Sequence, residues 1–176
     1  MNFFLLLGFL TLSLSLNLRD DIGEELKFDY YDYQALGDQF LLHFFTSTDA
    51  NKLVNCLTNA PPIDTYFGWA ANNFTRINVL NPKKVTQGIR ILFLAYKKIL
   101  TDISPCASSS PSMQKLITQL ENIIAITVPE KLAVYVCDQG GKFKQDLLSF
   151  SSLWKKQSYR NCGDPIGDFL LNLAKI

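Results

Sequence analysis

The clearest helical pattern in the chain lies in residues 84–103, which read KVTQGIRILFLAYKKILTDI. Apolar side chains recur there at spacings of three and four residues, which gather them on one face of an α-helix. They are Ile89, Leu92, Phe93, Tyr96, Ile99, Leu100 and Ile103. Ile91 and Leu94 widen this apolar stripe. The pattern therefore predicts a helix that lies near the centre of a helical bundle.

Apolar spacing predicts further helices, most of them preceded by residues that cap helix starts or by a proline. They cover residues 50–59, 64–75, 112–127, 142–159 and a short segment after Asp164-Pro165. Residues 132–137, LAVYVC, have the β-branched content of a strand but lie between Pro129 and Gly140, as a helix would. We favour a helix because nothing nearby offers a strand to pair with. The sequence thus predicts an all-α bundle of five to seven helices.

The chain begins with an uncharged apolar segment, MNFFLLLGFLTLSLSL. Its length and the small residues that follow predict a signal peptide over residues 1–15, cleaved after Ser15. The lack of Lys or Arg before the apolar core departs from the usual pattern. A membrane anchor is the alternative, but a spanning helix needs about 20 apolar residues. We therefore expect a protein that is secreted or resides in the lumen of the secretory pathway, with no transmembrane span.

Four cysteines follow this segment, at Cys56, Cys106, Cys137 and Cys162. An even number of cysteines in an oxidising compartment predicts two disulfides. Three pairings are possible, and we favour Cys56–Cys106 with Cys137–Cys162 because each pair brackets adjacent helical segments. A zinc site is disfavoured because the chain has no C-x-x-C spacing and a single histidine, His43. No metal or other cofactor is expected.

Charge is distributed unevenly along the chain. Residues 19–32 carry six acids and two bases, a net charge of −4, whereas the chain from Tyr33 onward carries ten acids and fifteen bases, a net charge of +5. We expect an acidic, tyrosine-rich arm over residues 16–36 and a single helical domain over residues 37–176. Such an arm could be solvated and without a partner, or it could lie on its own domain or on a neighbouring copy. The overall net charge of +1 disfavours nucleic acid as a partner.

Two features outside the cysteines are candidate sites. The segment Phe28–Tyr33, FDYYDY, has no clean period and is expected to be extended, with Tyr30, Tyr31 and Tyr33 as candidate partner-binding residues. Asn73 begins the acceptor sequence Asn-Phe-Thr for N-glycosylation. The alternative is that Asn73 is not glycosylated, because its neighbours suggest a partly buried helix.

No residues are predicted to be catalytic. His43 stands among Phe and Leu residues, as a core histidine would, and the chain lacks a G-x-S-x-G motif. The cysteines are better used as disulfides than as nucleophiles, and no acid after Tyr33 falls on an evidently apolar face. The turn Gly140-Gly141-Lys142 is not a phosphate-binding loop.

These observations together predict a secreted, non-enzymatic helical protein that binds another protein or associates with itself. The alternative function is an extracellular carrier of a lipid or other apolar ligand, which the wide stripe over Ile89–Tyr96 would suit.

Overall fold

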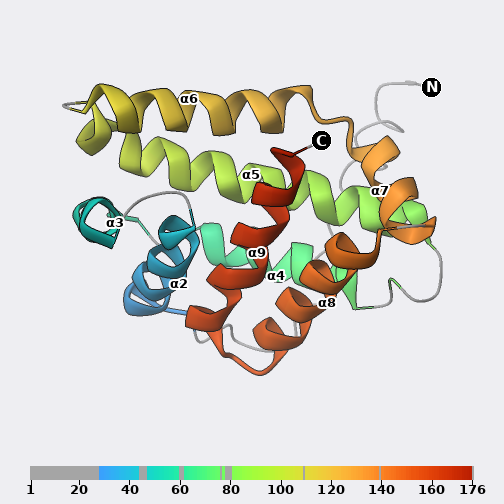
Figure 1. Cartoon of the computed structure of the whole chain (residues 1–176). Helices are drawn as coiled ribbons and strands as arrows, with labels where there is room; N and C mark the ends of the chain where they lie inside the picture. The colour runs from blue at the N-terminus through green and yellow to red at the C-terminus, as the bar shows by residue number, and fades with distance from the viewer. Residues whose placement is uncertain are drawn as a thin grey trace, which may run out of the picture.

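The structure is a computed structural model, and its described residues are 28–43, 47–59, 62–75, 77, 81–108, 110–138 and 140–175. Over these ranges the regular elements are all α-helices (Figure 1), as predicted. They are α2 (Tyr30–Leu42), α3 (Ser47–Val54), α4 (Ile63–Phe74), α5 (Pro82–Ala107), α6 (Pro111–Ile126), α7 (Pro129–Asp138), α8 (Gly141–Lys155) and α9 (Tyr159–Leu173). These eight helices exceed the predicted five to seven, because α2 was not expected. The predicted signal peptide, residues 1–15, lies outside the described residues.

Helix α5 is the longest of them, with 26 residues. The Asn81 side chain accepts a hydrogen bond from the backbone N–H of Lys84, and Pro82 occupies the first turn. The helix continues past Ile103, the last residue of the predicted helical pattern, through Pro105 to Ala107. Pro105 is exposed, so water can satisfy the carbonyl group that its missing N–H leaves unpaired. Within the described ranges neither α5 nor any other helix has the length and apolarity needed to cross a membrane.

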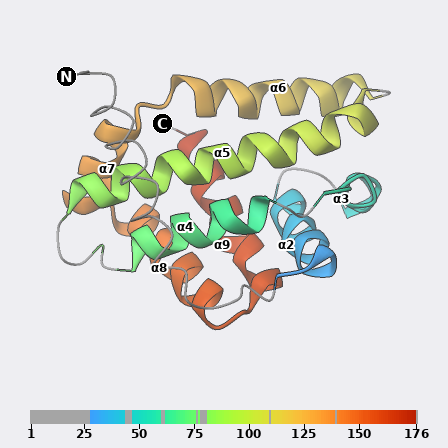
Figure 2. The same ribbon diagram turned by 180° about the vertical axis from the view of Figure 1, so that it is seen from behind.

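The helices pack around α5 on several sides. Helix α6 runs antiparallel beside α5, and α4 lies along another side of it (Figures 1 and 2). Helix α7 contacts α5 at the end that α6 approaches, and α9 packs against both α2 and α8. The central position predicted for residues 84–103 is therefore confirmed.

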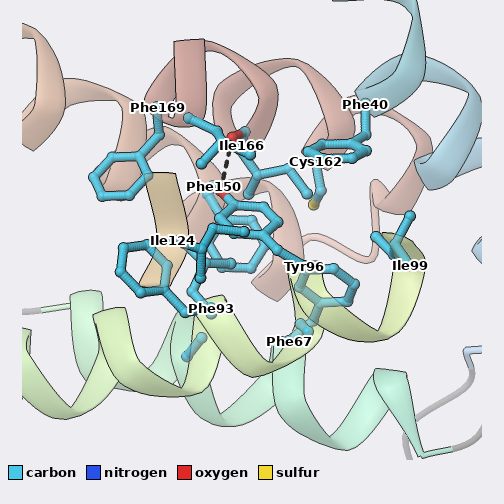
Figure 3. Packing of buried hydrophobic residues seen from close by; sticks show 14 of the residues in the cluster. Phe40, Phe67, Phe93, Tyr96, Ile99, Ile124, Phe150, Cys162, Ile166 and Phe169 are labelled. Carbon is cyan, nitrogen blue, oxygen red and sulfur yellow. Dashed lines mark hydrogen bonds between the residues drawn. The ribbon is translucent and has the colours of Figure 1, made fainter. Parts of the chain in front are cut away.

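Tyr96 of α5 connects three helices at the centre of the core (Figure 3). It is fully buried, and its hydroxyl group donates a 2.7 Å hydrogen bond to the backbone carbonyl of Ile166 in α9. Its ring stacks on Phe40 of α2, with 5.5 Å between the ring centroids. Phe67 of α4 meets Phe150 of α8 edge-on at 6.0 Å. Because the buried hydroxyl has a partner, this polar atom does not destabilise the apolar core.

Two helix crossings depend on glycine because the helices approach too closely for a side chain. A Cβ atom on Gly163 of α9 would lie 2.5 Å from the carbonyl oxygen of Leu36 and 2.8 Å from the backbone nitrogen of Phe40, both in α2. A Cβ atom on Gly88 of α5 would lie 2.5 Å from the ring of Phe74 in α4. The first crossing is the tighter constraint, since backbone atoms cannot rotate away as a ring can.

Residues Tyr30–Leu42 form helix α2, so the expectation of an extended arm is wrong for the residues from Tyr30 onward. Asp29 caps the helix by accepting from the backbone N–H of Asp32, and the Asp32 side chain accepts in return from the backbone N–H of Asp29. Tyr33 and Leu36 are fully buried. Residues 30–36 are therefore part of the helical core, and the predicted boundary at residue 37 is wrong. The rest of the predicted arm, up to residue 27, lies outside the described residues.

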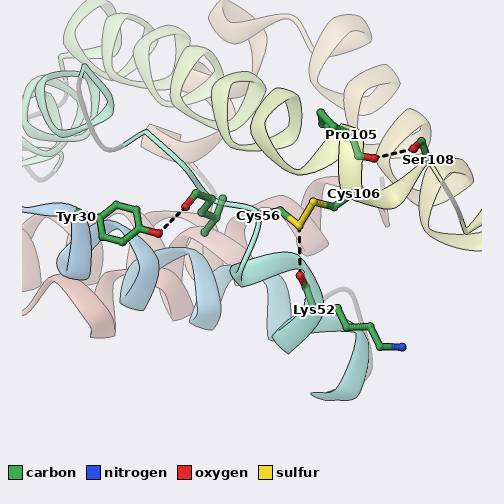
Figure 4. Close-up of a disulfide and its surroundings, with 7 residues drawn as sticks. Tyr30, Lys52, Cys56, Pro105, Cys106 and Ser108 are labelled. Carbon is green, nitrogen blue, oxygen red and sulfur yellow. Dashed lines mark hydrogen bonds between the residues drawn. A yellow bond between two sulfur atoms is a disulfide. The ribbon is translucent and has the colours of Figure 1, made fainter.

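The predicted disulfide between Cys56 and Cys106 is confirmed (Figure 4). It joins the segment that follows α3 to the last turn of α5, with 50 residues of sequence between the two cysteines.

The predicted Cys137–Cys162 disulfide is not formed, and both cysteines are buried free thiols. Cys137 lies in the last turn of α7, near the charges of Asp138 and Lys144. Cys162 lies in the first turns of α9, next to Gly163, which faces α2. The expectation of two disulfides is therefore wrong for this structure, because helix packing gives the two thiols different neighbours.

We expect Cys137 and Cys162 to react with iodoacetamide only after unfolding. Burial raises the pKa of the Cys162 thiol to about 12 and also raises that of Cys137, so neither forms much of the reactive thiolate at neutral pH. Peptide mapping without reduction should show both residues alkylated in denaturant and neither in the native protein. A disulfide-linked peptide pair that contains both would contradict the structure.

Candidate functional site

The three candidate tyrosines occupy different environments. Tyr33 is fully buried, and its hydroxyl group donates a 2.8 Å hydrogen bond to Asp102 in α5. Tyr30 is partly exposed and donates to the backbone carbonyl of Leu57 at 3.1 Å. Tyr31 is 76% exposed. Tyr33 is therefore a core residue, the prediction that all three serve a partner is wrong for it, and Tyr31 is the most accessible of them.

Asn73, the predicted glycosylation site, lies in the last turn of α4. Its side-chain amide donates a 2.8 Å hydrogen bond to the backbone carbonyl of Trp69, and its Cβ atom lies against Gly88 of α5. The side chain is partly buried. In the folded chain the acceptor nitrogen is thus hydrogen-bonded to the backbone of its own helix. Glycosylation at Asn73 stays a prediction.

A polar cluster lies where α8 and α9 meet the end of α2. Asp146 is buried on α8 and accepts a 3.2 Å hydrogen bond from the side-chain amide of Asn172. Desolvation and the neighbouring negative charge of Asp168 raise the pKa of Asp146 to about 6. His43 lies 3.7 Å from Asp168, and its other ring nitrogen is 2.8 Å from the carbonyl oxygen of Gln39. The Asp146 carboxyl group can therefore hold a proton in mildly acidic solution.

The expectation that no acid lies on an apolar helix face is wrong for Asp146. It stands three residues after Phe143 and four before Phe150, on the stripe that faces the core. That spacing is a signal which sequence reasoning missed. In the part of the chain that the structure describes, no three His, Cys, Asp or Glu side chains gather as metal ligands.

We expect the free energy of unfolding to fall as the pH rises from about 4 to about 6, since folding raises the pKa of Asp146 and ionisation then costs the folded state more than the unfolded one. Asp146→Asn should remove most of this decrease. Urea unfolding followed by circular dichroism across this pH range measures it. Glu121→Gln, at an exposed position on α6, is the control and should keep the decrease. An unchanged pH dependence in Asp146→Asn would show that another group is responsible.

Large apolar side chains are exposed near the junction of α5, α6 and α7. Ile126 at the end of α6 is 77% exposed, Leu94 of α5 is 51% exposed and Val134 of α7 is 49% exposed. Val128, in the connection between α6 and α7, is 46% exposed. A group of exposed apolar side chains is typical of a surface that contacts another macromolecule. Single exposed apolar residues scattered over a surface are common and do not indicate such a contact.

The ion pair between Arg90 and Glu130 places Leu94 and Val134 in one region of the surface. Leu94 lies one helical turn after Arg90, and Val134 lies one turn after Glu130, so each is a neighbour of the ion pair on its own helix. Ile126 and Val128 precede Glu130 by four and two residues. We call this region the 90/130 surface and define it by Arg90, Leu94, Ile126, Val128, Glu130 and Val134.

Comparison with protein-family models, with curated proteins and with solved structures finds no match for this chain.

Proposed function

We propose that this is a secreted, non-enzymatic binding protein that associates with a second copy of itself through the 90/130 surface. The observation that carries the proposal is the exposure of Leu94, Ile126, Val128 and Val134 around a single ion pair. Burying such side chains against a partner contributes about 25 cal/mol per Å² of apolar surface removed from water. A monomer gains nothing from keeping them exposed.

Charge favours a second copy as the partner. The surface holds one base, Arg90, and one acid, Glu130, both more than half exposed at the side chain. A two-fold axis places the same surface on both sides of an interface. Arg90 of one copy can then meet Glu130 of the other, so the surface is complementary to itself. A strongly basic or acidic partner has no such complement here.

The carrier alternative rests on the wide apolar stripe over Ile89–Tyr96. Ile89, Leu92, Phe93 and Tyr96 of this stripe are buried in the protein core, which supports self-association over a carrier role. Secretion is supported by the apolar N-terminal segment and by the Cys56–Cys106 disulfide, since disulfides persist in oxidising compartments.

We expect Ile126→Lys to weaken self-association about ten-fold, because it places a charge at the most exposed apolar side chain of the proposed contact. Sedimentation velocity over a concentration series measures the monomer–dimer equilibrium. The matched control is Ser152→Lys, which adds the same charge at an exposed position of α8. A wild-type protein that stays monomeric throughout contradicts self-association, and equal dimerisation of the two variants contradicts the choice of surface.

A further inference from the structure

A polar groove lies between α2 and the end of α3, on elements that do not contribute to the 90/130 surface. Its volume is about 360 Å³, which is at the small end of the range for ligand sites. Helix α2 contributes Gln34, Ala35 and Asp38, and the other wall consists of Asn51, Val54 and Asn55.

Four of the six lining residues carry a planar hydrogen-bonding group. Each of the three amides, in Gln34, Asn51 and Asn55, has two N–H donors and a carbonyl acceptor, and the Asp38 carboxylate adds further acceptors. The only apolar lining residues are the small side chains of Ala35 and Val54. A complementary ligand must therefore present many donors and acceptors close together, with little apolar surface between them.

Two of these polar groups are held in place by neighbours outside the groove. The amide nitrogen of Gln34 donates to the hydroxyl oxygen of Tyr30, which itself donates to the backbone of Leu57. The Asp38 carboxylate forms an ion pair with Arg160 of α9, at 3.7 Å. Side chains that are already oriented lose less conformational entropy when a ligand binds. The ion pair also balances the charge of Asp38, which favours a neutral ligand over a charged one.

An exposed aromatic residue, Tyr31, lies one helical turn before the groove residue Ala35. The two residues therefore share a face of α2. Tyr31 is 76% exposed, and its ring meets that of Tyr30 edge-on at 5.9 Å. An aromatic face next to amides and a carboxylate suits a ligand with hydroxyl groups on its edges and C–H bonds on its faces, which describes a pyranose ring.

We propose that this groove binds a neutral sugar, a terminal residue or short segment of a glycan. Gln34, Asp38, Asn51 and Asn55 hydrogen-bond its hydroxyl groups, and Tyr31 packs against its C–H face. The site does not depend on self-association, because it lies on α2 and α3. The ligand proposed for Tyr31 is thus a sugar, whereas the sequence led us to expect a protein partner for the tyrosine-rich segment.

The test is titration of the full-length ¹⁵N-labelled protein with methyl glycosides of glucose, mannose and galactose and with di-N-acetylchitobiose. We expect saturable shifts of the side-chain amide signals of Gln34, Asn51 and Asn55 with at least one of them. Asn51→Ala/Asn55→Ala should weaken that binding about ten-fold, since it removes two hydrogen-bonding groups from an exposed wall. Tyr31→Phe should retain binding, and Tyr31→Ala should weaken it.

Asn122→Ala on α6 is the matched control, because it removes an exposed amide from a different face and should leave binding unchanged. Circular dichroism of each variant checks that the fold is retained. Absence of saturable shifts with all four sugars overturns the proposal. Unaltered affinity of the Asn51→Ala/Asn55→Ala variant for the sugar, measured from its backbone amide signals, also overturns it, because the two amides then do not contribute to binding.

Discussion

Gly163→Ala should lower the free energy of unfolding by about 3 kcal/mol, at the upper end of what an added methyl group costs in a packed core. The added Cβ would lie 2.5 Å from the carbonyl oxygen of Leu36 and 2.8 Å from the nitrogen of Phe40. Both atoms belong to the backbone of α2, so the whole helix must move away from α9 to relieve the overlap. Urea unfolding followed by circular dichroism at neutral pH measures the change.

Gly141→Ala is the matched control, since it makes the same chemical change in another helix. A Cβ atom on Gly141 meets nothing within 4 Å. Alanine also loses less conformational entropy than glycine when a helix forms, so this variant should be as stable as the wild type or slightly more so. Gly167→Ala should have an intermediate effect, because its Cβ would meet the imidazole ring of His43, a side chain that can rotate. Equal stabilities of the Gly163 and Gly141 variants would contradict the close crossing of α2 and α9.

Loss of the Cys56–Cys106 disulfide should lower the free energy of unfolding by about 4 kcal/mol. The crosslink closes a loop of 50 residues, and the chain-entropy treatment of the unfolded state assigns about 4 kcal/mol to a loop of that length. The variant to measure is Cys56→Ser/Cys106→Ser, again by urea unfolding. The loop contains all of α4 and most of α5, so the crosslink restricts a segment of the unfolded chain that supplies many of the buried apolar residues of the folded protein.

Reduction provides the control for this prediction. A reductant should destabilise the wild-type protein to the level of the double variant and should leave the double variant unchanged. Because Cys137 and Cys162 are free thiols, neither of them contributes to the response. A wild-type protein whose unfolding is insensitive to reductant would show that the crosslink adds no stability.

The sequence predicted the helical class and α5 because their signal is local. Spacing of apolar residues over five turns needs no knowledge of the rest of the chain. Helix α2 was missed because tyrosines and acids alternate in FDYYDY without a clean period. A local signal was present, since Asp29 and Asp32 have the spacing of a capping box. The buried hydroxyl group of Tyr33 has its hydrogen-bond partner in Asp102, 69 residues away. No pattern in the neighbouring sequence can indicate such a distant partner.

The candidate sites were less predictable than the fold. Arg90 and Glu130 are 40 residues apart, and their pairing depends on how α7 folds back onto α5. The amides of the polar groove become neighbours only after α2 and α3 pack. Leu57, which follows α3, lies against Gly37 of α2. Exposed polar residues leave no periodic signal, so their grouping follows from tertiary structure alone.

The Cys56–Cys106 bond has a further consequence for a protein that meets proteases. A single cut of the backbone anywhere between residues 57 and 105 leaves both fragments joined through sulfur. The nicked chain therefore stays one covalently joined particle, and the two fragments separate only when the bond is reduced.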